Sequence, residues 1–166
     1  MQSISLFQVF VLIAFSLLSP WATVHGATAV SSDIIGDVIW SVEGSPYVLG
    51  NSARIEKDSR LRIMQGTIIQ NDGTDGVSTL IADGIIQIQG SASLPVKIGP
   101  SVEVIFSSTS IGSNISDARF FGSGKSAIRI ESQGVQISNS HFDENAYGIY
   151  VAYGGGMDVT HSEFKD

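Results

Sequence analysis

Apolar and polar residues alternate along most of this chain, in short segments separated by single glycines. Leu61 and Ile63 alternate with arginines, and Ile86 and Ile88 alternate with glutamines. A period of two is typical of β-strands with one buried face and one polar face. No stretch keeps a helical period, so we expect strands of about four to six residues joined by turns, which is an all-β fold.

The sequences of two segments are each compatible with two interpretations. At 31–42, Ile34, Ile35, Val38 and Ile39 could line one side of one or two helical turns, or form a strand rich in β-branched residues. The stretch NDGTDG at 71–76 predicts a turn, because its Asp-Gly pairs tolerate positive φ. Its carboxylates could also bind calcium, although it lacks the longer series ending in Glu that an EF-hand loop has. We expect no other cofactor.

A fixed spacing of roughly 22 residues orders the back half of the chain and falls within the range of solenoid repeats. The positions that recur with this spacing are Phe120, Phe142 and Phe164; Ile115, Ile137 and Val159; and Ala118, Ser140 and Ser162. In a solenoid, each coil buries its apolar side chains only against its neighbours. The sequence therefore predicts a parallel β-helix of about five to six coils of roughly 22 residues. A hairpin-based sandwich would not keep this spacing.

The N-terminal segment has the features of a secretory signal peptide. An apolar run from Leu6 to Leu18 is followed by Pro20 and by a small-residue site at Ala27-Thr28-Ala29. The first five residues lack Lys and Arg, so a retained membrane anchor is the alternative, but the run is short for a spanning helix. We expect a signal peptide at 1–29, a β-helix domain at 30–166, and secretion to the periplasm or outside the cell, with no membrane insertion after cleavage.

The net charge limits the kinds of partner that the protein can bind, and the absence of cysteine limits how its fold can be stabilised. The net charge is −7, which argues against nucleic acid and anionic membrane surfaces, since either would require a basic patch. The chain has no cysteine, so a secreted form must be stabilised by packing and hydrogen bonds without disulfides.

One stretch resembles a known family. The sequence ISNSHFDENAYGI at 137–149 is similar to the right-handed parallel β-helix repeat of pectate-lyase-like and NosD-like secreted proteins. Features that look similar to the opening coils of such proteins are Trp40, Ser45-Pro46-Tyr47, Leu61-Arg62-Ile63, Gly66, Ala82-Asp83-Gly84 and Pro95-Val96-Lys97-Ile98. The resemblance implies a right-handed helix with Asn139 and Asn145 at turns. It implies fold more than function, because these motifs are structural.

The repeat also aligns outward-facing positions. Arg119, His141 and Glu163 should form one column, with Asp143 beside it, and Tyr150 should face outward because Ile149 and Val151 face inward. Exposed aromatic rings on a flat face suit stacking on sugars, and the two histidines His141 and His161 with Glu163 or Asp143 could instead bind a transition metal. The candidate ligand-binding residues are Tyr150, His141, Asp143, Arg119 and Glu163. No short metal-ligand spacing is present, so we predict no metal centre there. No group of residues matches a catalytic motif.

Three functions fit these observations. The first is a non-catalytic secreted or cell-surface module that could bind polysaccharide. The second is a pectate-lyase-like carbohydrate-active enzyme, a lyase or glycoside hydrolase, or an N-terminal part of one. The third is a NosD-like periplasmic accessory protein. Because Phe164 stands close to the end of the sequence, we also expect end-to-end self-association or further coils in a longer chain.

Overall fold

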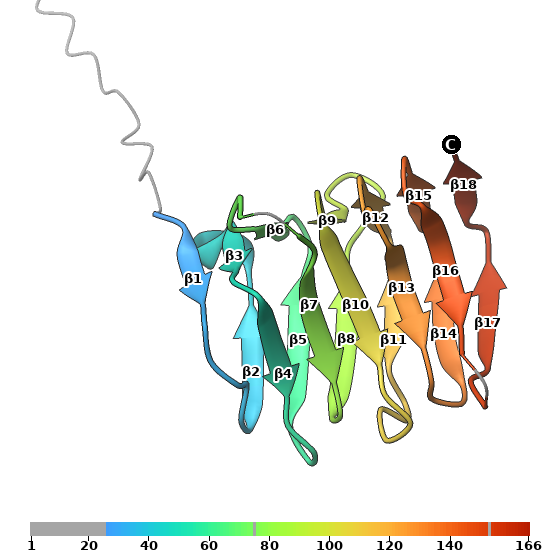
Figure 1. Ribbon diagram of the computed structural model, residues 1–166, viewed down its shortest axis with the longest axis horizontal. Helices are drawn as coiled ribbons and strands as arrows, with labels where there is room; N and C mark the ends of the chain where they lie inside the picture. Colours follow the sequence, from blue (N-terminus) through green and yellow to red (C-terminus); the bar gives the residue numbers. More distant parts are fainter. Residues whose placement is uncertain (1–25, 75, 153) are drawn as a thin grey trace, which may run out of the picture.

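Three parallel β-sheets run the length of the molecule, and each complete coil of the chain contributes one strand to each sheet (Figure 1). The computed structural model describes residues 26–74, 76–152 and 154–166. Together these residues form a β-solenoid of about six turns, as the sequence predicts.

The strands are named in chain order and grouped here by sheet. Sheet A contains β1 (Thr28–Val30), β3 (Tyr47–Leu49), β6 (Ile68–Asn71), β9 (Val96–Ile98), β12 (Ala118–Phe121), β15 (His141–Asp143) and β18 (Glu163–Lys165). Sheet B contains β4 (Ser52–Ile55), β7 (Ser78–Ala82), β10 (Val102–Phe106), β13 (Ser126–Ile130) and β16 (Tyr147–Val151). Sheet C contains β2 (Asp37–Trp40), β5 (Arg60–Met64), β8 (Ile85–Gln89), β11 (Asn114–Ser116), β14 (Val135–Ser138) and β17 (Met157–Thr160).

The segment at 31–42 is extended. Ile34 forms a parallel bridge with Ile55 in line with sheet B, and β2 pairs with β5 in sheet C. The strand interpretation of this segment is therefore correct and the helical one is wrong. Within the described residues the single helical element is a short 3₁₀ turn, η1 (Val42–Gly44).

The residues that recur at a fixed spacing in the sequence lie directly above one another. Phe142 is in register with Phe120 on one side and Phe164 on the other, in sheet A. Their rings are stacked, with centroids 5.0 Å and 4.7 Å apart and planes within 6° of parallel. Ile128 and Ile149, whose spacing in the sequence is slightly shorter, are likewise in register in sheet B. The period in the sequence is thus the length of one coil.

A column of serines holds the corner between sheets C and A. The hydroxyl of Ser140 accepts a hydrogen bond from the Ala118 N–H at 3.3 Å, and the hydroxyl of Ser162 accepts one from the Ser140 N–H at 3.2 Å. Asn139 and His161, at the same corner, have φ of 48° and 50°. The polar side chains satisfy backbone groups that a sharp corner would leave unpaired, which explains why serine recurs in the repeat.

The N-terminal prediction falls mostly outside the described residues. The apolar run at 6–18 is among residues 1–25, whereas the predicted cleavage point after Ala29 lies inside β1. In the part of the chain that the structure describes, no helix has the length and apolar character needed to cross a membrane. The signal peptide stays a prediction.

Candidate functional site

Four of the five predicted ligand-binding residues meet on the outer face of sheet A. Arg119, His141 and Glu163 are successive partners across β12, β15 and β18, and Asp143 is the partner of Lys165. The four predicted residues and Lys165 together line a shallow hollow of about 290 Å³. The sequence predicted this cluster because the three coils have the same length.

Most of the charged side chains in this hollow form ion pairs with one another. The Nε of Arg119 donates to Oδ2 of Asp143 at 2.6 Å, and Nδ1 of His141 lies 3.1 Å from Oε2 of Glu163. Lys165, and to a lesser degree His141, lower the pKa of the Glu163 carboxyl. A carboxyl with a lowered pKa is a poor proton donor at neutral pH, so Glu163 is not suited to act as a general acid. The hollow resembles a surface ion-pair network, which contributes little to stability.

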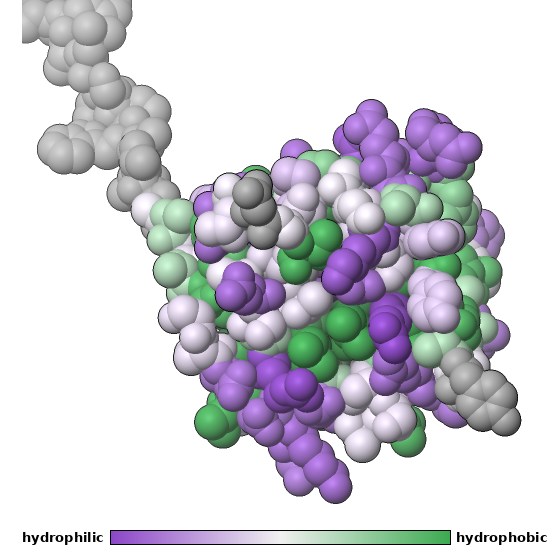
Figure 2. Space-filling view, viewed as in Figure 1, coloured by the Kyte–Doolittle hydropathy of each residue, from purple (hydrophilic) through white to green (hydrophobic). Residues whose placement is uncertain are grey.

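Tyr150, the fifth predicted residue, lies on a different sheet. It belongs to β16 in sheet B, where 49% of it is exposed, and the Arg129 guanidinium carbon lies 5.9 Å from its ring centroid. The predicted residues therefore form one cluster on sheet A and a separate tyrosine on sheet B. Figure 2, in the same view as Figure 1, shows hydrophobic residues in the middle of the molecule's visible face.

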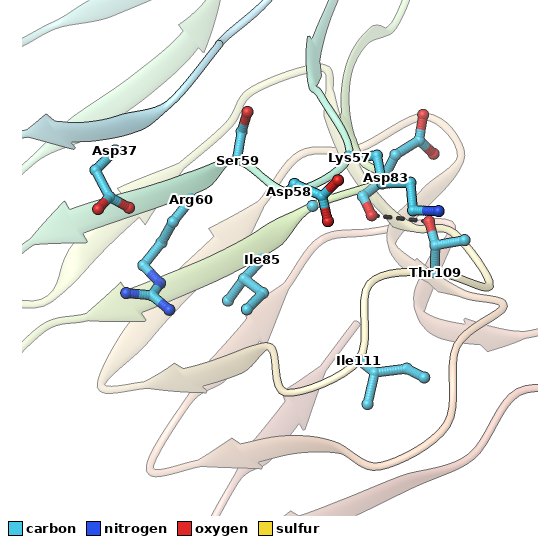
Figure 3. A pocket seen from close by; sticks show the side chains of 10 residues that line it. Asp37, Lys57, Asp58, Ser59, Arg60, Asp83, Ile85, Thr109 and Ile111 are labelled. Atoms are coloured by element: carbon cyan, nitrogen blue, oxygen red, sulfur yellow. Dashed lines mark hydrogen bonds between the residues drawn. The ribbon is translucent and has the colours of Figure 1, made fainter.

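A second hollow, which the sequence did not predict, lies where the chain turns from sheet B to sheet C (Figure 3). In three successive coils the connecting turns span 56–59, 83–84 and 107–113, so a short turn lies between two longer ones. The short middle turn leaves a cleft of about 350 Å³. Figure 3 shows Arg60 and Ile85 on neighbouring strands and Thr109 and Ile111 on the longest turn.

The short turn in the cleft is held tightly. A Cβ atom on Gly84 would collide with the carbonyl oxygens of Ser59 and Glu56, so this position requires glycine. The Ser107 hydroxyl and the Arg54 guanidinium lower the pKa of the Asp83 carboxyl, and Arg54 forms an ion pair with it. Polar groups thus fix the floor of the cleft. The signal that could have revealed the cleft is the change in turn length between coils.

The outer face of sheet C carries an ordered array of amides and hydroxyls, which sequence reasoning missed. One column across β5, β8, β11, β14 and β17 consists of Arg62, Gln87, Asn114, Gln136 and Asp158. The next column consists of Met64, Gln89, Ser116, Ser138 and Thr160. Neighbouring residues of a column are about 4.8 Å apart, which is the spacing of paired strands.

The side-chain amides of this array have no hydrogen-bond partners among the described residues. The side chains of Gln87, Asn114 and Gln136 make no hydrogen bond there, and the buried Nε of Arg62 is likewise unbonded. An amide side chain offers two donor hydrogens and an acceptor oxygen. We name Gln87, Asn114 and Gln136 the amide column. It differs from the hollow on sheet A, where the charged groups already pair with one another.

The turn at 71–76 uses its polar groups internally. Oδ1 of Asp72 accepts hydrogen bonds from the Thr74 N–H at 2.9 Å and from the Thr74 hydroxyl at 2.6 Å, and these bonds lower the pKa of the Asp72 carboxyl. Asp75, the second carboxylate of the predicted calcium alternative, lies outside the described residues. Among the residues that are described, no group of three or more His, Asp or Glu is placed to hold a metal ion. Calcium binding stays a prediction.

Comparison with known proteins finds no family model that matches the chain, and no curated protein or solved structure that is similar to it.

Proposed function

We propose that the protein is a non-catalytic module, secreted or attached to the cell surface, that binds a polysaccharide chain along the outer face of sheet C. The observation that carries this proposal is the amide column. Three consecutive coils present Gln87, Asn114 and Gln136 in register, with no hydrogen-bond partner in the described chain.

The regular spacing of the column favours a polymeric ligand. Its donors and acceptors recur about every 4.8 Å along the solenoid axis. A repeating surface of this kind can make the same hydrogen bonds to successive units of a repeating chain. Each bond contributes about 0.5–1.5 kcal/mol, so affinity would arise from several weak contacts acting together.

The charge of the face favours a neutral polysaccharide. Between Arg62 at one end of the column and Asp158 at the other, the side chains are uncharged amides. The parallel column from Gln89 to Thr160 adds hydroxyls. Sugar hydroxyls can donate to and accept from both kinds of group, whereas an acidic polymer would need unpaired cations along its path.

The resemblance to the pectate-lyase-like or NosD-like group supports a similar fold and does not by itself support a similar activity. A uronate lyase needs a base near the sugar α-proton and cations that neutralise the uronate. A copper(I) site favours thiolate and thioether ligands, and this chain has no Cys and three Met. The amide column supplies neither chemistry, so a binding role is the better supported of the three functions.

Affinity gel electrophoresis tests the proposal directly. The protein would migrate through gels containing hydroxyethyl cellulose, xylan or polygalacturonate. We expect retardation by a neutral polymer, and a loss of affinity of about tenfold or more when Gln87, Asn114 and Gln136 are all changed to Ala, since about 1.4 kcal/mol corresponds to tenfold. Gln70→Ala, which removes an amide from β6 on sheet A, is the matched control and should leave retardation unchanged.

Two outcomes would overturn the proposal. If none of the three polymers retards the protein, or if the triple variant is retarded as strongly as the unchanged protein, the amide column is not a polysaccharide site. Release of unsaturated uronate from polygalacturonate, followed by ultraviolet absorbance with and without added calcium, would replace the binding role with a lyase activity.

A further inference from the structure

The arginines of this chain differ in whether they have a partner of opposite charge. Arg54, Arg119 and Arg129 each form an ion pair with a carboxylate. The remaining arginines, Arg60 and Arg62, form no ion pair within the described residues. Acidic residues outnumber Lys and Arg by 16 to 9, so this lack of partners does not reflect a shortage of carboxylates.

The two unpaired arginines are neighbours on one face. They are two residues apart on β5, and both extend from the outer face of sheet C, because Leu61 and Ile63 are fully buried. At about 3.3 Å per residue, their Cα atoms are about 6.6 Å apart. A charge-assisted hydrogen bond spans about 2.8 Å between its heavy atoms, so one oxyanion lying between the two guanidinium groups can accept from both.

Both guanidinium groups are held against the sheet. The Nε atoms of Arg60 and Arg62 are covered by the protein and have no hydrogen-bond acceptor, whereas their Nη nitrogens are uncovered and equally unbonded within the described chain. A charged group that is partly covered and has no counter-charge is unfavourable, and an anion bound at the Nη nitrogens would compensate it. The planar Nη ends are thus presented to solvent in an arrangement that exists before a ligand arrives.

Arg60 also lines the cleft between sheets B and C (Figure 3). The lining includes three further charged side chains without an ion pair in the described chain, Lys57, Asp37 and Asp58. Figure 3 shows the Arg60 side chain pointing from β5 toward Ile85 on β8, with Asp37 on the β2 side. The guanidinium group of Arg60 therefore points away from the strand that carries Asp37.

The unpaired charges of this region leave a single positive surplus. Lys57, Arg60 and Arg62 outnumber the two unpaired carboxylates of the cleft by one. The third carboxylate of the lining, that of Asp83, is already paired with Arg54. Beyond Arg62 the column continues with uncharged amides, so the surplus suits one anionic group at this position and not a polyanion along the face.

We propose that Arg60 and Arg62, assisted by Lys57, bind a single sulfate or phosphate ester group at the mouth of the cleft. A carboxylate has two oxygens, which one guanidinium fork can occupy by itself. A tetrahedral ester group has three free oxygens, enough for both arginines and the lysine. Arg62 is in register with Gln87, so this site adjoins the amide column, but it uses different residues and a different kind of contact.

Nuclear magnetic resonance of the arginine side chains tests the inference. The nitrogen-labelled protein would be titrated with the 6-sulfate and 6-phosphate esters of glucose, with glucuronate and with glucose, which share a sugar ring and differ in one group. We expect the Nε–H signals of Arg60 and Arg62 to move on addition of an ester, and those of Arg54, Arg119 and Arg129 to stay. Glucuronate should bind about tenfold more weakly than the better ester, and glucose should give no saturable shift. The ester with the lower Kd identifies the source of the group.

Substitutions locate the site. The double variant Arg60→Gln, Arg62→Gln should weaken ester binding about tenfold or more. Arg129→Gln, which removes an arginine that is already paired, is the matched control on sheet B and should bind as the unchanged protein does. Arg62→Lys keeps the charge and loses the planar fork, so it should weaken binding by less than the double variant does.

Three results would overturn the inference: Arg60 and Arg62 signals that no ester moves, glucuronate binding as tight as that of both esters, or a double variant that is folded by circular dichroism and binds an ester as tightly as the unchanged protein. The arginine double variant should still be retarded by a neutral polymer, and the triple variant of the amide column should still bind an ester. This inference and the proposed function therefore fail separately.

Discussion

The first and last coils of this solenoid use the same kind of contact with opposite results. Trp40 stacks on Tyr47 with ring centroids 4.5 Å apart, and Phe164 stacks on Phe142 at 4.7 Å. Trp40 is nevertheless buried, whereas about half of Phe164 is exposed. Stacking on one neighbour covers only one face of a ring. A terminal coil is closed only when its own residues also cover the outer face.

The surroundings of Trp40 explain the closed end. The Tyr47 hydroxyl beneath it accepts a hydrogen bond from the Ser41 N–H at 3.1 Å, which ties the chain after Trp40 to the next coil. The Thr28 hydroxyl donates to the Gly44 carbonyl at 2.6 Å, so β1 is held to the same turn. The last coil is also tied to the coil before it, through the Ser162 hydroxyl, which accepts from the Ser140 N–H, and the Lys165 carbonyl, which accepts from the Glu144 N–H, yet about half of Phe164 stays exposed. Interior and open-end positions of the same column should therefore differ in their response to substitution.

The largest difference is expected within the phenylalanine stack. Phe142→Ala removes a fully buried ring between two others and should lower the free energy of unfolding by about 3–5 kcal/mol. Phe164→Ala should cost less than half as much, because half of that ring is already in water. Urea unfolding of the two variants measures both values. Equal losses would show that the C-terminal end is covered in solution.

Two glycines provide the second comparison. Gly84→Ala would place a Cβ against the backbone carbonyls of Ser59 and Glu56, which cannot move without breaking the corner, and should cost about 1–3 kcal/mol. In Gly148→Ala the new Cβ would lie 2.6 Å from Cδ1 of Phe164, a side chain that is about half exposed and so has room to shift toward solvent. Thermal unfolding should rank Gly84→Ala well below Gly148→Ala. The reverse order would mean that Phe164 is held rigidly.

The serine column gives a smaller effect. The buried Ser140 hydroxyl accepts from the Ala118 N–H and donates to the Ser138 carbonyl at 2.9 Å, so Ser140→Ala should cost about 1–2 kcal/mol by leaving the buried N–H unpaired. Ser162→Ala removes the equivalent hydroxyl at the open end, where water can replace it. Amide hydrogen exchange at Ala118 and Ser140 should therefore accelerate strongly in the first variant and weakly in the second. Equal acceleration would contradict the difference between the ends.

The smallest effect concerns acid stability. The pKa of Asp83 is lowered in the folded protein, so its contribution to stability is present above the ordinary value of 3.8 and is lost as pH falls through the folded value. Asp83→Asn should remove less than about 1 kcal/mol at neutral pH, because the Arg54 side chain is 41% exposed, and should flatten the loss below pH 4. Glu163→Gln, in the exposed pair at the open end, should change the pH profile less. Unfolding curves between pH 3 and 7 measure both.

The outer faces of sheets A and B show which parts of a site can be predicted from the sequence. Arg119, His141 and Glu163 were predicted as one column because they share the spacing of the phenylalanines, and the structure places them in register. Their ion pairs, and the separation of Tyr150 onto sheet B, depend on how side chains meet across strands. The sequence contains no direct signal for those contacts.

The sequence by itself determined the architecture. Inward positions alternate with polar ones and recur with each coil, and a chain with that pattern can bury its apolar residues only by stacking. Tertiary structure alone decided the cleft and the amide column. Arg62, Gln87 and Asn114 are in register although their spacings along the chain are unequal, because the turns between their strands differ in length. Which residues of two coils become neighbours depends on how those turns fold, and that information is not local to either coil.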